Sequence, residues 1–346
     1  MTETWKKKQL EWLAIGHEVR RRELDQSVKF EKCPAPASSQ LALLQIFMDT
    51  LDGNTTPGIA AKQVSDWVLS IPDDDICYDI HRAYANMMGV LISATSQLSF
   101  QAHLEILAEF TIELARQPDA YNNKDTPLIF ESGSVVVLPG ERIVMPCISG
   151  GALWSGLPDF AFRMMDDLDR GPPNFFPLFI PGREDQHQID CQAEENYTNI
   201  STFAALIAGK NPPNDFPLRS CLDCALKVFK FLECGPDTER GKWSHLAVRA
   251  AAAWLVIAGD KLLHSSPAST VVGNCSDSPW EAQNSHHIVN IERLRFWGER
   301  FQYFRESGKL ISQQAVDSTY DATVVIESLI TRHGQRAING RGSLNQ

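Results

Sequence analysis

The chain has 346 residues, 43% of them hydrophobic and 22% charged, and its 32 Lys and Arg against 43 Asp and Glu give a formal net charge of −11. This composition is typical of a globular protein and excludes disorder over most of the chain. The acidic balance argues against nucleic acid or an anionic membrane as the main partner, because both bind through an excess of Lys and Arg. No apolar run reaches the roughly 18 to 20 residues of a membrane-spanning helix.

The first 37 residues are expected to form an N-terminal segment that is partly helical. Lys6, Lys7 and Lys8 precede a stretch that is too polar for the apolar region of a signal peptide. We therefore expect a cytoplasmic protein. The eight cysteines fit this location, because their spacing is irregular and the chain is too long to need disulfides for stability.

Apolar residues then recur at helical spacing. Negative charge at Asp73–Asp75 suits the start of a helix, and Thr56-Pro57 provides a cap and a first-turn proline. Gly53 is a stop signal. These patterns predict four helices before Pro118, over Ser38–Gly53, Ile59–Ser70, Ile76–Leu91 and Phe100–Gln117.

Proline and glycine become frequent between residues 119 and 188, which predicts an irregular insert. Short strands are expected at Ser134–Leu138 and Ile143–Met145, around the turn Pro139-Gly140, and one short helix at Pro158–Leu168. An irregular stretch of this length is often functional.

Helical patterns return after the insert. They predict helices over residues 193–208, 216–234, 238–263, 285–306 and 312–333, followed by a disordered tail at 334–346. An alanine-rich stripe through Leu246, Ala250 and Trp254 predicts a closely packed central helix. The predicted fold is a single all-α, bundle-like domain over residues 38–333 that carries the irregular insert.

Several motifs for metal or cofactor chemistry are incomplete. Cys221 and Cys224 form a CxxC that falls inside a predicted helix and lacks a second ligand pair, so we expect structural cysteines. Asp74, Asp75 and Asp79 resemble half of the magnesium site of a terpene cyclase, but the second motif is missing. His286-His287 cannot share one face of a helix. We predict no cofactor and no metal.

Large aromatic side chains could form an apolar pocket. The candidates for substrate binding are Trp154, Tyr197, Phe203, Trp254 and Trp297. The candidate catalytic groups are His81, Glu195 and Asn199, and Glu195, Asn199 and Phe203 are spaced i, i+4, i+8 on one helix face. The alternative is ordinary packing, with the aromatic rings in the core and Asn199 bridging two helices.

Four segments resemble a family known as domain of unknown function 3632. Residues 195–205, ENYTNISTFAA, are similar to its W-x-N-L-N-A-F-x-A signature, although Tyr197 stands for the usual Trp and Ser201 for the second Asn. The remaining likenesses are Phe216–Ser220 with Ala225-Leu226, Ala250–Gly259, and Leu294–Phe301. The resemblance spans about residues 40 to 330 and implies a fungal, intracellular, all-helical protein. It implies no settled catalytic residues.

These observations leave three functions open. The first is a cofactor-independent cyclase or isomerase that acts on an apolar polyketide or terpenoid intermediate of fungal specialised metabolism. The second is a non-catalytic interaction or regulatory protein, and the third is a magnesium-dependent terpene cyclase. The expected partner is a small apolar substrate, and the sequence leaves the oligomeric state open. A closed cavity of several hundred Å³ would favour the first function, and a filled bundle the second.

Overall fold

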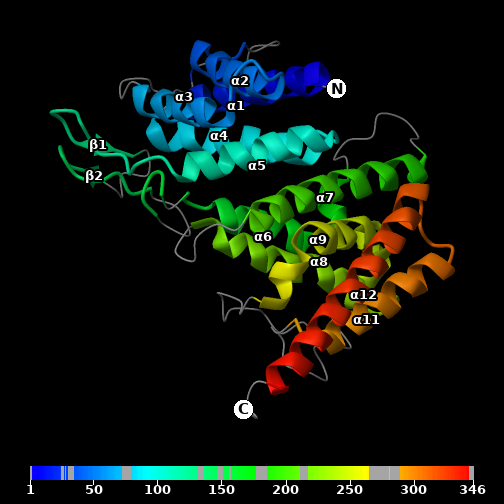
Figure 1. Cartoon of the computed structure of the whole chain (residues 1–346). Helices are drawn as coiled ribbons and strands as arrows, with labels where there is room; N and C mark the ends of the chain where they lie inside the picture. Colours follow the sequence, from blue (N-terminus) through cyan, green and yellow to red (C-terminus); the bar gives the residue numbers. More distant parts are fainter. Residues whose placement is uncertain are drawn as a thin grey trace. The chain divides into compact units, whose positions relative to one another are not determined.

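The protein is described by a computed structural model over residues 2–24, 27, 29, 35–71, 79–130, 136–145, 151–155, 157–176, 185–210, 217–264, 280 and 289–342. Helices dominate these residues, with one small two-stranded sheet, which confirms the all-α fold class with a strand-bearing insert (Figure 1). None of the described helices is both long and apolar enough to cross a bilayer.

The chain forms two compact units where the sequence predicted one domain over residues 38–333. Unit 1 comprises Met1–Phe162 with Asp215–Leu218, and unit 2 comprises Arg163–Asn214 with Arg219–Gln346. Hydrophobic periodicity shows which face of each helix is buried, but it does not show which helices share a core. The N-terminal segment also belongs to unit 1, because its helix packs on the next one.

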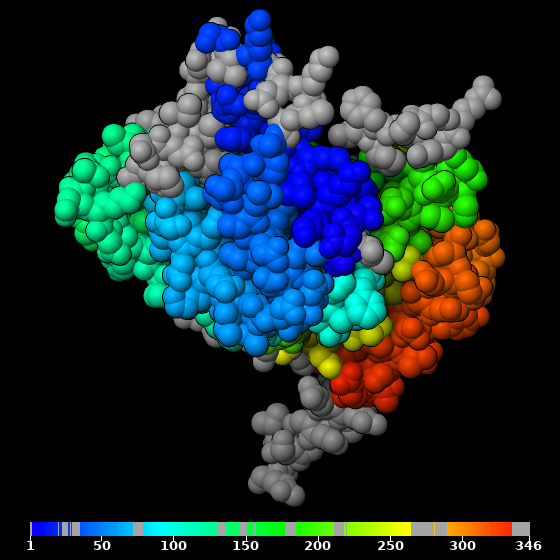
Figure 2. All heavy atoms as spheres, turned by 90° about the horizontal axis from the view of Figure 1, so that it is seen from above, coloured from blue at the N-terminus to red at the C-terminus, as the bar shows by residue number. Residues whose placement is uncertain are grey.

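The described part of unit 1 contains the five helices α1 to α5, and the caps predicted for them are partly confirmed. The Thr56 hydroxyl accepts a hydrogen bond from the Ile59 amide (3.4 Å), and Gly53 follows the preceding helix with a φ of 76°. Residues 72–78, and with them Asp73–Asp75, lie outside the described residues. Neighbouring helices of this unit form a continuous surface, in blue tones in Figure 2. The helices are α1 (Thr2–Leu24), α2 (Ser38–Leu51), α3 (Pro57–Ser70), α4 (Ile80–Gln97) and α5 (Gln101–Ala115).

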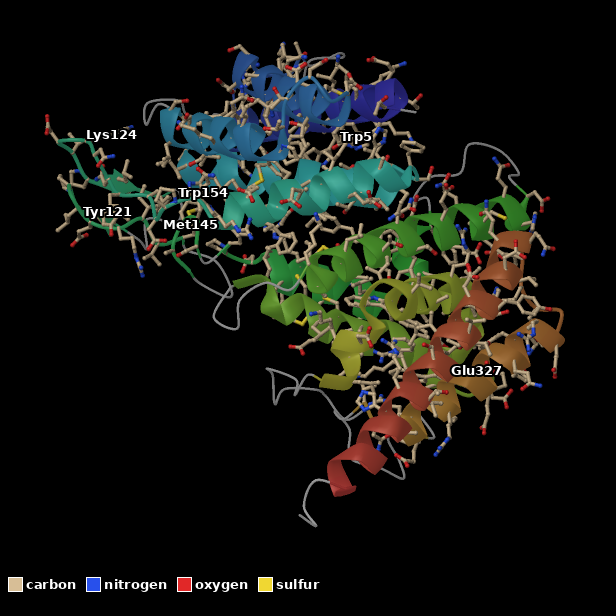
Figure 3. All side chains as sticks on the ribbon, viewed as in Figure 1. Trp5, Tyr121, Lys124, Met145, Trp154 and Glu327 are labelled. Carbon is tan, nitrogen blue, oxygen red and sulfur yellow. The ribbon has the colours of Figure 1, made fainter. Side chains whose placement is uncertain are left out.

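The strand insert differs from the prediction. Strand β2 (Val136–Val137) lies in the predicted region, but it pairs antiparallel with β1 (Leu128–Ile129), which was not predicted. The segment after the Pro139-Gly140 turn bonds to residues 120–122 instead, through Ile143 N to Ala120 O at 2.8 Å. Two-residue ladders carry too little alternation to be recognised in a sequence. Figure 3 labels Tyr121 and Lys124 in this insert.

Unit 2 is organised around the alanine-rich helix α9 (Ser244–His264), as predicted. This helix packs against α7 (Gln186–Gly209), α8 (Cys224–Glu233), α11 (Ile291–Glu306) and α12 (Gln313–Gly342). Helix α6 (Phe160–Arg170) begins at the end of unit 1 and leads into the second unit. Short 3₁₀ turns connect these helices: η1 (Pro172–Phe175), η2 (Pro217–Asp223) and η3 (Gly241–Trp243). Helix α12 continues to Gly342, whereas the sequence predicted a helix that ends at His333 and a disordered tail over residues 334–346.

A buried ion pair joins α8 to α11 in the core of unit 2. Arg293 Nε donates to Glu233 Oε1 (2.8 Å) and Arg293 Nη2 donates to Oε2 (3.1 Å), and both side chains are fully buried. Trp297 Nε1 donates to the same Oε1 at 2.7 Å, while its ring stacks on Phe229 at 3.7 Å. The carboxylate therefore accepts three hydrogen bonds from described side chains and lies beside stacked aromatic rings.

We predict that Glu233→Gln lowers the free energy of unfolding by about 3–5 kcal/mol, because it removes the Glu233 charge that faces the fully buried Arg293 guanidinium. Chemical denaturation followed by circular dichroism measures the change. Glu292→Gln on α11, next to Arg293, is the matched control, since Glu292 is exposed and lies 4.0 Å from Arg295. Equal free energies of unfolding for Glu233→Gln and Glu292→Gln would contradict a stabilising role of the buried Glu233–Arg293 ion pair.

Candidate functional site

The residues predicted for the site are divided between the two units. His81 and Trp154 belong to unit 1. His81 is half-buried, with its ring edge-on to Phe130 at 6.4 Å between centroids. Trp154 is fully buried, 5.9 Å from the Tyr84 ring, and Figure 3 places it beside Met145. The other six residues belong to unit 2.

Helix α7 carries the predicted stripe of Glu195, Asn199 and Phe203. Phe203 is fully buried and Asn199 is 7% exposed, whereas Glu195 is only half-buried. Tyr197, on the same helix, donates its hydroxyl hydrogen to the Leu168 carbonyl at 3.0 Å and lies 6.0 Å from the Phe231 ring. The stripe is therefore turned into the packed interior at two of its three positions.

The two predicted tryptophans of unit 2 are also core side chains. Trp297 donates its Nε1 hydrogen to Glu233, and the Trp254 side chain, which extends from α9, is fully buried. All five predicted aromatic residues thus have the burial of core residues, which is the alternative weighed in the sequence analysis. A role for them, or for His81, Glu195 and Asn199, in substrate chemistry stays a prediction.

The sequence analysis missed the buried carboxylate one position before Glu195. Glu194 is 1% exposed and its Oε2 accepts from Arg249 Nη1 on α9 (3.3 Å) and from the Ser312 hydroxyl just before α12 (3.1 Å). Its Oε1 has no hydrogen-bond donor within the described part of the chain. Burial raises the pKa of Glu194, and the Arg249 charge opposes that rise.

We predict that Glu194 makes stability fall as the pH rises. The folded protein holds its proton above the ordinary pKa of 4.5, so the stability from this group is complete below that pH and is lost as the pH rises through the raised folded pKa. Because Glu194→Gln cannot titrate, the melting temperature of the wild type relative to this variant should decrease from about pH 4.5 to 7.

Thermal melts of both proteins across this range measure the effect, with Glu195→Gln as the control on the half-buried neighbour. A difference between wild type and Glu194→Gln that stays constant with pH would contradict the prediction.

The CxxC cysteines are buried where η2 passes into α8, not in the middle of one helix as predicted. Burial raises the pKa of Cys221 to about 12 and that of Cys224 well above its ordinary range, which disfavours the reactive thiolate. Among the described residues, no three His, Cys, Asp or Glu side chains are arranged to hold a metal ion. Asp79 caps α4, while Asp74, Asp75, His286 and His287 lie outside the described residues.

We predict that a maleimide reagent at pH 8 labels Cys191 before Cys221 or Cys224 in the native protein, because Cys191 is only half-buried. Peptide mapping by mass spectrometry identifies the labelled positions, and labelling in urea provides the fully reactive reference. Native-state labelling of Cys221 or Cys224 at the rate of Cys191 would show that the pair is accessible.

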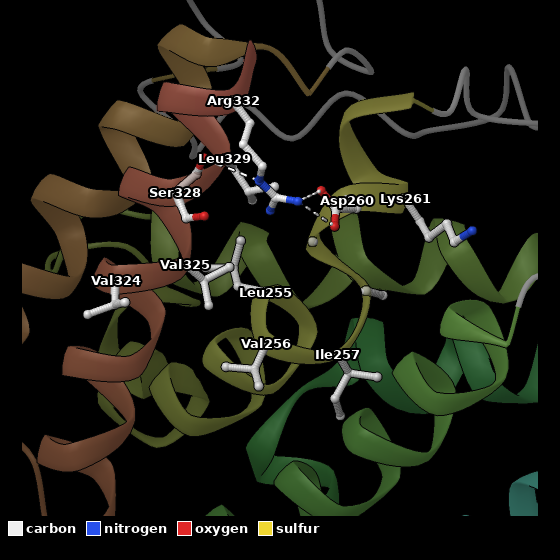
Figure 4. A pocket seen from close by; sticks show the side chains of 12 residues that line it. Leu255, Val256, Ile257, Asp260, Lys261, Val324, Val325, Ser328, Leu329 and Arg332 are labelled. Atoms are coloured by element: carbon white, nitrogen blue, oxygen red, sulfur yellow. Dashed lines mark hydrogen bonds and ion pairs between the residues drawn. The ribbon is translucent and has the colours of Figure 1, made fainter. Parts of the chain in front are cut away.

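A groove of about 380 Å³ lies between α9 and α12 in unit 2 (Figure 4). Leu255 and Leu329 are buried in its walls, whereas Val256 and Val324 are 55% and 65% exposed at its mouth. Gly259 lets the two helices approach closely, since a Cβ there would lie 3.1 Å from Leu329 Cδ1. The α9–α12 groove is therefore an apolar concavity with exposed apolar side chains.

Polar groups are concentrated at one end of the α9–α12 groove. Arg332 Nη1 lies 3.1 and 3.2 Å from the two carboxylate oxygens of Asp260, and Arg332 Nε donates to the Ser328 carbonyl at 3.4 Å (Figure 4). The Ser328 side chain also lines the groove. Such an arrangement can hold an apolar molecule by its body and orient a polar end.

The comparisons with known proteins bear on the family alone. The model of the family described as "Protein of unknown function (DUF3632)" matches residues 89–301, more than half of the chain. The chain belongs to this family. The match contains the resemblance segments around α7, α9 and α11 and confirms the family expected from the sequence. No curated protein and no solved structure matches the chain.

Proposed function

We propose that this member of the DUF3632 family is a non-catalytic binding protein that holds a small apolar molecule in the α9–α12 groove. The proposal rests on the volume of the α9–α12 groove together with the apolar side chains that line it. About 380 Å³ lies within the usual range of small-molecule sites, roughly 300–1,000 Å³. Exposed apolar side chains at the mouth gain free energy when a ligand removes them from water.

The packing of the predicted aromatic residues supports binding over catalysis. The rings predicted to form an apolar reaction pocket are buried. Trp297 stacks on Phe229, and the Tyr197 hydroxyl donates to the Leu168 carbonyl. The α9–α12 groove in turn offers Ser328, Asp260, Lys261 and Arg332 as its polar groups. Asp260 and Arg332 are paired with each other. We retain the fungal, cytoplasmic setting as part of this proposal.

A cofactor-independent cyclase or isomerase of an apolar polyketide or terpenoid intermediate is the second candidate. The volume of the α9–α12 groove also supports this enzyme, because the groove could hold a substrate of that size. Such an enzyme accelerates a reaction chiefly by holding its substrate in a near-attack conformation. The two candidates differ in the fate of the ligand. A bound compound recovered unchanged supports a binding protein, and recovery of an isomer of equal mass supports the enzyme.

We predict that Val324→Glu weakens binding of the neutral fluorescent probe N-phenyl-1-naphthylamine about ten-fold. The substitution places a charge at the mouth of the α9–α12 groove. It also removes an apolar contact of Val324, and a fully buried Val side chain is worth roughly 1.5–3 kcal/mol. A fluorescence titration measures the affinity. An uncharged probe keeps simple repulsion by the acidic protein out of the comparison.

Val19→Glu is the matched control, since Val19 is a 40% exposed valine on α1 in the other unit. It should leave probe binding unchanged. Equal affinity of the probe for wild type and Val324→Glu would refute the assignment of the groove.

A further inference from the structure

A second, smaller pocket in unit 2 is lined by basic side chains. It measures about 100 Å³ and lies where η3, the start of α9 and the end of α11 meet. We call it the cationic pocket and define it by Lys242, His245, Arg300 and Lys309, with Tyr303 and Phe304 as its aromatic wall. None of its lining residues is acidic, although the whole chain has a net charge of −11.

Arg300 is held in place by backbone groups and has no carboxylate partner. Its Nε donates to the Leu232 carbonyl (2.7 Å) and its Nη2 to the Cys234 carbonyl (3.0 Å), at the C-terminal end of α8. Within the described residues, Nη1 has no hydrogen-bond acceptor and the guanidinium forms no ion pair. Burial lowers the pKa of Arg300 but leaves a group of this type charged. The side chain is thus positioned to bind a further acceptor.

Lys309 adds to the positive field around Arg300, and His245 lines the same pocket. Lys309 Nζ donates to the Tyr303 hydroxyl at 3.2 Å and forms no ion pair with any described carboxylate. Burial lowers the pKa of His245, the Lys309 charge lowers it further, and Asp190 on α7 opposes both. Lys242 is partly neutralised by the exposed Glu239 at 2.6 Å. Two permanent cations therefore face the pocket without a counter-ion among the described residues.

We propose that the cationic pocket binds the phosphate group of a small phosphorylated molecule. A phosphate monoester carries about −1.5 to −2 charges at pH 7 and several strong acceptor oxygens, which matches two unpaired cations better than a carboxylate does. Its size also fits, since about 100 Å³ is well below the roughly 300–1,000 Å³ of a pocket that encloses a whole small molecule and leaves room for a compact group. The pocket therefore takes the phosphate group, and the rest of the molecule extends outside it.

Thermal melts and calorimetric titration with inorganic phosphate at pH 7 test the proposal. Sodium chloride at matched ionic strength corrects for screening. Phosphate should raise the melting temperature more than chloride does, and acetate should behave like chloride. Equal effects of phosphate and chloride would overturn the proposal, and an acetate affinity equal to that of phosphate would overturn the preference for phosphate.

Variants locate the site. Lys309→Gln and Arg300→Lys should each weaken phosphate binding about ten-fold, the first by removing a charge and the second by replacing the planar guanidinium fork. Arg300→Lys keeps a cation near the end of α8. Because Lys309 is exposed, a folded Lys309→Gln protein remains informative if Arg300→Lys is unstable.

Lys62→Gln is the control, because it changes the net charge by the same amount at an exposed lysine of α3. It should bind phosphate like the wild type. Wild-type affinity in Lys309→Gln, or a loss in Lys62→Gln as large as in Lys309→Gln, would show that phosphate binds elsewhere or through net charge alone.

Discussion

The buried pair of Glu233 and Arg293 is the constraint on which unit 2 depends. Two fully buried charges are tolerable only when each is neutralised and hydrogen-bonded, which requires α8 and α11 to adopt one mutual position. Trp297 adds a third donor to the same carboxylate, and the Trp297–Phe229 stack covers it. Small shifts of either helix would break several contacts together, so the cluster specifies the arrangement as well as stabilising it.

Local features of the fold could be predicted because their causes are local. Thr56 caps α3 through its own side chain, Gly53 follows α2 with a positive φ, and the alanine stripe of α9 allows close packing by several helices. The β1–β2 ladder and the division into two units could not be predicted in this way. Both depend on which segments meet in space, and a two-residue strand leaves almost no periodic pattern.

The candidate site illustrates the same limit at the level of single residues. Spacing on α7 favoured Glu195, yet Glu194 is the buried carboxylate. Its burial could not be predicted from local spacing, because its partners Arg249 and Ser312 are 55 and 118 residues away in the chain. Tyr197, Phe203, Trp254 and Trp297, predicted to bind substrate, are fully buried. Periodicity could not tell a ring in a core from a ring on a pocket wall, and the α9–α12 groove arises only when two separate helices are brought together.

Helix α9 carries residues of both the cationic pocket and the α9–α12 groove. His245 and Val256 are eleven residues apart, which corresponds to about three helical turns and roughly 16 Å along the axis, so they point to nearly the same side. Ala252 lies between them and is buried, so the intervening surface is closed by packing. The helix consequently acts as a rigid spacer between two concavities. Occupants of both would be kept apart, and energetic coupling between them could pass through α9 or through the packed α11–α12 pair.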